Sequence, residues 1–308
     1  MATITFNCPR CKDLCAFKDI YSGRRARCLR CDQVFIIPAA ENGKAQKVER
    51  SSKGFDDPLP GFYEAVFKNS WRAIFNKQSL TALVFIFAAI SLKFFTVHLD
   101  YSFRIVGAAI GFTVLLPVGF IIAGFVWGGI FWCYAEIIYT TAFDVEVLPQ
   151  MDFEGGFGYM FKVMRSFYTV FIALLVSLLP AIIAKMIFTL FGVGANWVIL
   201  PFVVLGMFLF PMAILTVSIG RDLLMLFRPD YFFAPIRKAF WHYLFLAGLF
   251  ILTWQLQYMS LNYKDVADKS DLMILLSLLA ALAIQILAIF TMRATGLFYR
   301  HFVCFFKW

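Results

Sequence analysis

The sequence predicts an all-α polytopic membrane domain of about six transmembrane helices, preceded by a small N-terminal β zinc ribbon. Of its 308 residues, 61% are hydrophobic and 15% are charged, whereas a soluble domain contains roughly 25% charged residues. The apolar residues gather in runs of about 20 or more, long enough to cross a bilayer, and two CxxC motifs stand near the N-terminus. These observations exclude a soluble globular protein.

The first module, residues 1–38, contains the two CxxC motifs, Cys8 with Cys11 and Cys28 with Cys31. Two such motifs can place four thiolates around one ion, and the metal supplies folding energy that so short a segment cannot obtain from a core. A disulfide pair or a thioredoxin-like redox motif is disfavoured, because the cytoplasm is reducing and no βαβ pattern surrounds either motif. We predict one structural Zn²⁺, with all four coordination positions filled by these cysteines.

Other residues of this module leave alternatives open. Cys15 is either an alternative ligand or a spare thiol near the cluster. Four arginines around the second motif form either a solvated basic face or a contact surface for anionic lipid, an acidic protein or nucleic acid: Arg24, Arg25, Arg27 and Arg30. A head tethered to a membrane favours lipid or a protein partner, so nucleic acid is disfavoured as a partner. The net charge of +9 is typical of a membrane protein whose cytoplasmic loops are basic.

A polar segment without apolar periodicity, residues 39–60, follows the module and predicts a flexible linker. The helical transmembrane domain, residues 61–308, begins with residues 62–77, where aromatic and basic side chains alternate. That pattern is typical of a helix lying in the head-group region of the bilayer.

Six apolar runs in this domain predict six spans, at about 79–97, 105–138, 163–190, 197–219, 241–262 and 272–292. The second run is longer than a bilayer requires, so it forms either one tilted or bent span or a re-entrant pair around Pro117. Gly124 and Gly128 on this run have the GxxxG spacing that allows helices to approach closely.

The distribution of basic residues predicts the orientation of the spans. With the N-terminus inside, three basic residues fall in outer loops: Arg104, Lys264 and Lys269. Many more fall on the cytoplasmic side: Lys68, Arg72, Lys77, Lys162, Arg165, Arg221, Arg228, Arg237, Lys238, Arg293, Arg300 and Lys307. This positive-inside bias predicts an even number of spans with both termini cytoplasmic, in the bacterial inner (cytoplasmic) membrane.

A search for catalytic residues finds no constellation that predicts an enzyme. The three histidines, His98, His242 and His301, form no HxxxH or HExxH motif, and no GxSxG, Walker or Rossmann glycine pattern occurs. Gln255 and Gln285 are the main deep polar side chains of the spans, which contain no Asp or Glu near their midpoints. Ion-coupled carriers usually place carboxylates there. The acidic loop over residues 144–154 is a candidate docking surface.

The motifs FNCPRC and RCLRC, followed by VF, resemble the short zinc-ribbon module at the front of many bacterial membrane proteins. The remaining chain is similar in layout to uncharacterised bacterial inner-membrane families. Paraquat-inducible-type proteins also combine cytoplasmic zinc ribbons with a helical membrane domain and work with lipid-transport partners. By analogy, the resemblance implies a cytoplasmic zinc head and a possible role in lipid transport.

The sequence thus predicts a non-catalytic integral membrane subunit or scaffold. It would act as a homo-oligomer or within a membrane complex, through its zinc ribbon and cytoplasmic loops. The alternative is a lipid or small-molecule transporter, or a component of one, without ion-coupling carboxylates. A membrane enzyme is the third class, for which the sequence shows no candidate residues.

Overall fold

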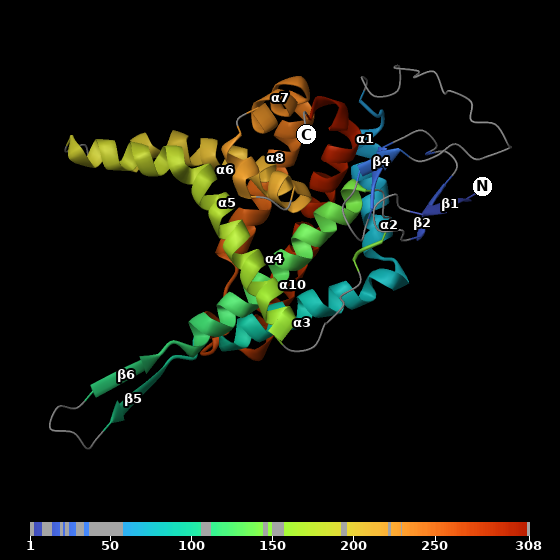
Figure 1. The fold of residues 1–308 in the computed structure, drawn as a ribbon. Helices are drawn as coiled ribbons and strands as arrows, with labels where there is room; N and C mark the ends of the chain where they lie inside the picture. Colours follow the sequence, from blue (N-terminus) through green and yellow to red (C-terminus); the bar gives the residue numbers. More distant parts are fainter. Residues whose placement is uncertain are drawn as a thin grey trace, which may run out of the picture. The chain divides into compact units, whose positions relative to one another are not determined.

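The computed structural model of the chain describes residues 3–7, 14–18, 21, 25–28, 34–36, 58–105, 112–143, 147–149, 157–191, 196–220, 223–228 and 230–306. The chain divides into two compact units, Met1–Phe55 and Asp56–Trp308. In the described part of the first unit, strands pair as two antiparallel hairpins, β1 with β2 and β3 with β4 (Figure 1). Their bounds are Thr3–Asn7 (β1), Leu14–Lys18 (β2), Arg25–Arg27 (β3) and Val34–Ile36 (β4).

The second unit is a multi-pass helical membrane domain, as the sequence predicts. Among its described residues, five helices are long and apolar enough to cross a bilayer. They are α3 (Leu80–Thr96), α4 (Val118–Ala142), α5 (Phe157–Leu190), α6 (Asn196–Gly220) and α10 (Asp271–Phe302). Two further helices, α7 (Asp230–Lys238) and α8 (Phe240–Met259), meet at 111° and together have the length and composition of a sixth span.

The predicted helix over residues 62–77 forms in four short pieces. They are α1 (Phe62–Glu64), a π-helical turn (Ala65–Asn69), α2 (Ser70–Ile74) and a 3₁₀ turn (Lys77–Ser79). One side of this segment is buried against α10, where Phe62 and Phe302 have ring centroids 5.6 Å apart. Its other side exposes Tyr63, Phe67 and Phe75. Its location in the head-group region stays a prediction.

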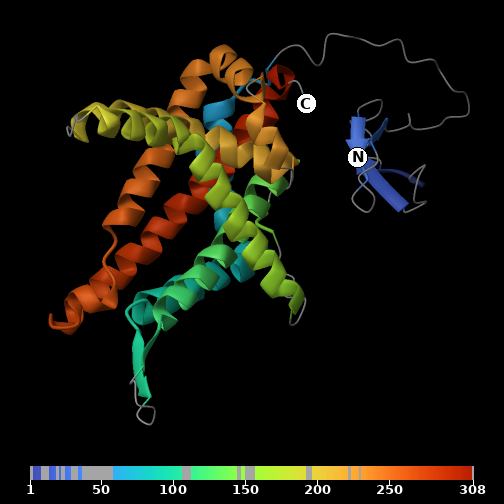
Figure 2. The same cartoon turned by 60° about the vertical axis from the view of Figure 1, so that its left-hand side comes forward.

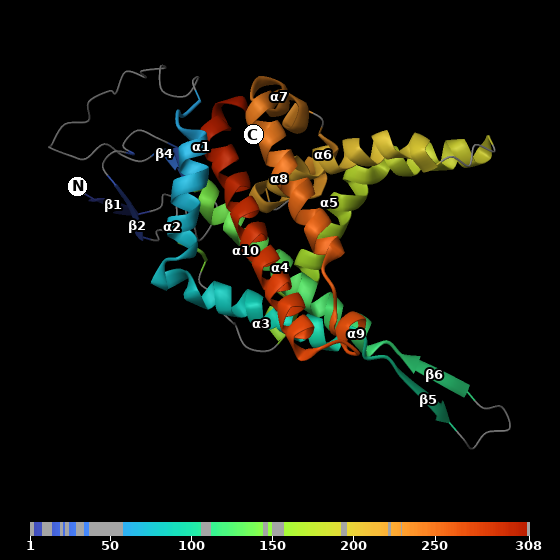
Figure 3. The same cartoon turned by 180° about the vertical axis from the view of Figure 1, so that it is seen from behind.

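The second span differs from the predicted 105–138. The region before Pro117 forms a β-hairpin of β5 (Tyr101–Ile105) and β6 (Phe112–Leu116), and α4 begins only after it, at Val118. Proline lacks an N–H and disfavours the helical conformation of the residue before it, so a helix cannot readily extend back through Pro117. The residues upstream are rich in aromatic and β-branched types, which favour strands. The run is therefore neither one bent helix nor a re-entrant helix pair, and its hairpin extends away from the helices (Figures 1 and 3).

Helix α10 lies at the centre of the domain. It contacts α4, α8, α3, α2 and α6, and Figure 2 shows it running beside α8. It approaches α4 closely at Gly296, where a Cβ would lie 2.7 Å from the Ile138 carbonyl oxygen and 2.7 Å from Thr141 Cβ. Only glycine permits this distance between the two backbones.

A second close approach joins α4 to α5 at Gly128, where a Cβ would lie 2.7 Å from the Val163 carbonyl oxygen. A Cβ on Gly124 would meet nothing within 4 Å. In the GxxxG spacing predicted on this helix, therefore, Gly128 is at a helix contact and Gly124 faces open space.

Arg293, counted above among the cytoplasmic basic residues, is buried inside the helical domain, with 3% of its surface exposed. The predicted span ended at 292, but α10 continues to Phe302 and its buried face includes Ala294 and Leu297. Arg293 therefore lies in the interior of the domain and does not count as a cytoplasmic loop residue. The positive-inside argument rests on the other basic residues.

The connections that follow α3 and α8 lie at the same end of the domain. The ring of Tyr263, in α9 (Tyr263–Val266), lies 5.6 Å from Phe95 and 5.9 Å from His98 between centroids. Both connections are outer loops in the predicted orientation.

This orientation can be tested with single cysteines in intact cells. A membrane-impermeant maleimide is expected to label cysteines at Ser102 and Ser270, which follow these connections, and not one at Asn42, because a charged reagent does not cross the apolar bilayer core. The unsubstituted chain gives the background from native cysteines. Labelling of a cysteine at Asn42 from outside would show that the predicted orientation is inverted. Labelling at only one of the other two positions would show that the two connections lie on opposite sides of the membrane.

Candidate functional site

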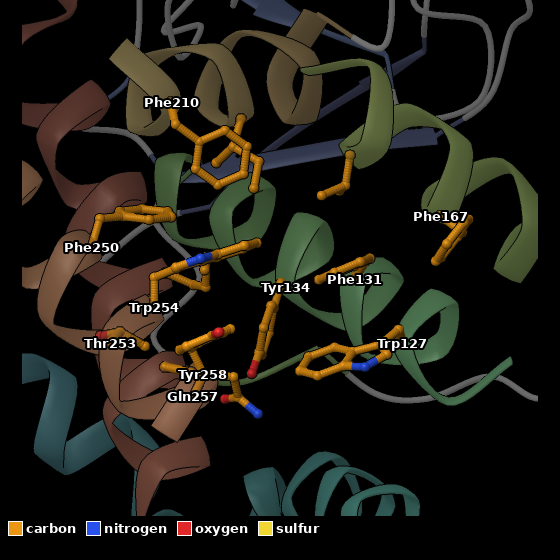
Figure 4. A pocket seen from close by; sticks show the side chains of 14 residues that line it. Trp127, Phe131, Tyr134, Phe167, Phe210, Phe250, Thr253, Trp254, Gln257 and Tyr258 are labelled. Atoms are coloured by element: carbon orange, nitrogen blue, oxygen red, sulfur yellow. The ribbon is translucent and has the colours of Figure 1, made fainter. Parts of the chain in front are cut away.

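A cavity of about 340 Å³ lies within the helical domain, between α4, α5, α6, α8 and α10 (Figure 4). Its walls are mostly aromatic and aliphatic. The residues that line it are Trp127, Phe131, Tyr134, Phe167, Val170, Phe210, Ile214, Phe250, Thr253, Trp254, Gln257, Tyr258, Ala288 and Met292. This volume is within the usual range for small-molecule sites, roughly 300–1,000 Å³.

The helices divide the cavity into a buried floor and an exposed rim. Phe210 of α6 and Ala288 of α10 are 2% exposed and form part of the floor. Phe167 of α5 and Trp254 of α8 are more than a third exposed, and Tyr258 of α8 is 81% exposed. The exposed side chains of the lining thus come from α5 and α8, which places the accessible side of the cavity at these two helices.

Helical periodicity places the lining residues of α8 on one face. Phe250, Thr253, Trp254, Gln257 and Tyr258 follow the spacing i, i+3, i+4, i+7 and i+8. The ring of Trp254 stands 5.8 Å from the ring of Phe210, at an angle of 74° between the planes. Such edge-to-face aromatic contacts stabilise the wall beyond simple burial.

A chain of hydrogen bonds crosses one end of the cavity. The hydroxyl of Tyr134 donates to Gln285 Oε1 at 2.6 Å, and Gln285 Nε2 donates to Gln257 Oε1 at 2.9 Å. Gln285 is fully buried, so this pairing offsets the cost of placing an amide in an apolar interior. Thr253 and Thr291 form a separate hydrogen bond of 2.9 Å between α8 and α10.

Sequence reasoning identified Gln285 correctly as a deep polar side chain but was wrong for Gln255, which is exposed on α8. Gln257, two residues further on, is the side chain that turns inward. The helical spacing from Phe250 to Gln257 could have shown this, because these two residues stand two turns apart on the same face.

Among the described residues that line the cavity there is no Asp, Glu, Lys, Arg or His. The amine of Lys93 lies outside the lining, 5.0 Å from the centroid of the Trp127 ring. This is a cation–π contact, which holds the amine against the indole.

The predicted zinc ligands fall in the connections of the two N-terminal hairpins. Cys8 and Cys11 stand between β1 and β2 in the sequence, and Cys28 and Cys31 follow β3. Cys28 is 2% exposed, whereas the other three lie outside the described residues. Among the described residues alone, no group of three or more His, Cys, Asp or Glu could hold a metal, so the zinc site stays a prediction.

Cys15 lies within β2, opposite Phe6 of β1. Of the basic residues around the second motif, Arg25 and Arg27 are exposed on β3, and Arg24 and Arg30 lie outside the described residues.

Two of the three histidines come together against Phe62. The Phe62 ring centroid lies 5.5 Å from that of His242 and 5.8 Å from that of His301. Nδ1 of His301 lies 3.0 Å from the Leu59 carbonyl oxygen, and the Leu59 N–H donates to the His301 carbonyl at 2.9 Å. These contacts fasten the start of the helical domain to α8 and α10.

The candidate docking loop, residues 144–154, is described only over 147–149. Within it Leu148 is fully buried, and its N–H donates to Ser79 Oγ at 3.1 Å. This leucine therefore belongs to the core of the helical domain. The acidic residues of the loop lie outside the described residues.

Comparison with protein-family models, with curated proteins and with solved structures finds no match for this chain.

Proposed function

We propose that the helical domain binds a lipid or another apolar molecule, as a lipid-handling protein or a component of a transporter. The observation that carries this proposal is the aromatic-lined cavity between α4, α5, α6, α8 and α10. A scaffold role, which the sequence places first, requires no such interior space. Assembly with itself or with other membrane proteins stays a prediction beside this one.

The composition of the cavity supports an apolar occupant. Cavities of this kind exclude water, because a water molecule needs two to four polar partners that an apolar wall does not offer. Burial of apolar ligand surface is favourable by roughly 25 cal/mol per Å². An acyl or isoprenoid chain would gain this energy along the rings of Phe131, Phe210 and Phe250.

The position of the accessible side of the cavity supports entry from the bilayer. Phe167 and Tyr258 lie there, on α5 and α8. Helix α5 has the length and composition of a membrane span, and α8 has them together with α7. In a bilayer, the accessible side at such helices faces lipid rather than water. A lipid could therefore enter sideways without crossing an aqueous phase.

Filling the cavity tests the proposal. Ala288→Phe places a ring at the floor and is expected to reduce the lipid that co-purifies in mild detergent to the background level, because the ring occupies the space of the ligand. Native mass spectrometry of the purified protein measures the bound lipid. Ala283→Phe, at an exposed position of the same helix, is the matched control.

The thermal midpoint of the Ala288→Phe variant distinguishes loss of lipid binding from misfolding. Ala288 lines the cavity, so we expect the new ring to extend into that space and the variant to remain folded, whereas a phenylalanine forced into a packed core costs about 1–3 kcal/mol. Wild-type protein without bound lipid, or an Ala288→Phe variant that is folded and retains its lipid, would contradict the proposed function.

A further inference from the structure

At the polar end of the cavity, each hydrogen bond has a defined donor and a defined acceptor. Tyr134 uses its only hydrogen on Gln285 Oε1, and Gln285 Nε2 donates to Gln257 Oε1. The chain ends at Gln257, whose oxygen is used and whose amide group carries two further hydrogens. Among the described residues no acceptor bonds to this amide nitrogen. Gln257 lines the cavity, so the site offers a hydrogen-bond donor to its occupant.

The described residues of the cavity lining are also uncharged. No lining residue carries a charge at neutral pH, and an unpaired charge in such a cavity would lose its hydration without compensation. Aromatic walls can bind organic cations, but the Lys93 amine already lies against the Trp127 ring. An anion would find only neutral hydrogen-bond donors among the described residues of the lining.

We infer that the cavity takes an uncharged amphiphile whose polar end is an ester, ether, carbonyl or hydroxyl oxygen. That oxygen accepts a hydrogen bond from the Gln257 amide, and the hydrocarbon part lies among the aromatic side chains of α4, α6 and α8. This inference rests on the proposed function and narrows it to neutral lipids.

Three probes that share one C18 chain test the charge preference. Monoolein is neutral, oleyl sulfate is permanently anionic and oleoylcholine is permanently cationic. The full chain in nanodiscs is labelled with a photoreactive monoolein carrying a diazirine on its acyl chain, and each unlabelled probe competes over the same series of mole fractions. Monoolein is expected to displace the label at a mole fraction about tenfold or more below that of either charged probe.

The hydrogen bond is tested by Gln257→Met, which keeps the length of the side chain and removes the donor. It should weaken monoolein binding by about fivefold to tenfold. The matched control is Gln255→Met, two residues away on the exposed side of α8, which should leave binding unchanged. If Gln257→Met does not fold, the three probes on the wild-type protein still decide the question.

The outcomes separate the inference from the function on which it rests. Equal or tighter competition by a charged probe, or a folded Gln257→Met variant with unchanged affinity, overturns the neutral-lipid inference and leaves lipid binding intact. If the photoreactive probe labels none of α4, α6 and α8, and no lipid co-purifies with the wild-type protein, the proposed function itself is wrong.

Discussion

Gly296→Leu is expected to prevent the helical domain from folding. At this position α10 and α4 approach so closely that even a Cβ would lie 2.7 Å from the Ile138 carbonyl oxygen. A backbone carbonyl within a helix cannot move aside as a flexible side chain can, so α10 must separate from α4. The cost is about 3 kcal/mol or more, at the upper end of the range for overpacked cores.

The yield of monodisperse protein after detergent extraction and its thermal midpoint measure this effect. Gly124→Leu on α4 is the matched control, because a side chain there would meet nothing within 4 Å, and its midpoint should stay near the wild-type value. A Gly296→Leu variant as stable as this control would show that α4 and α10 do not pack as described.

Cys28→Ser is expected to abolish zinc binding and unfold the N-terminal unit. Cys28 is one of four predicted thiolate ligands and is 2% exposed, directly after strand β3. A structural zinc site contributes about 10–16 kcal/mol to the folding of so small a module, and loss of one thiolate removes most of that energy.

Metal analysis of the purified full-length chain should give about one zinc per wild-type protein and almost none for Cys28→Ser. Limited proteolysis should then cut within the first unit of the variant and leave the helical domain intact. Cys15→Ser is the control and should keep its zinc, because Cys15 lies inside β2 rather than in a connection. Retention of full zinc by Cys28→Ser would rule out this ligand set.

Much of the helical fold could be predicted from the sequence because bilayer-spanning length is a local property of the chain. The spans expected at 163–190 and 197–219 differ from α5 and α6 by only a few residues. The span predicted at 105–138 was wrong because it was placed by apolar character, which helices and strands share. The helix begins only after Pro117. Hydropathy alone does not separate an apolar hairpin from the start of a helix.

The cavity could not be predicted in the same way, because its walls come from five helices distant in sequence. Gln285 was recognisable as a buried amide, but its partner depends on how α8 is rotated about its own axis. That rotation turns Gln257 inward and Gln255 outward. Periodicity along α8 limits which face of the helix can turn inward, and packing against α6 and α10 determines which face does so.

The central position of α10 has a consequence for the order in which the protein is made. The long helices that pack against α10 precede it in the chain, so a ribosome delivers α3 to α8 to the membrane before α10. Until then Gln257 and Tyr134 have no Gln285 to bond, and the α4 surface at Ile138 has no partner helix. Before α10 arrives, the earlier spans can pack against one another, as α4 does with α5 and α5 with α6, but their contacts with α10 are missing. The contacts that centre the domain on α10 therefore form only after the other spans have been inserted.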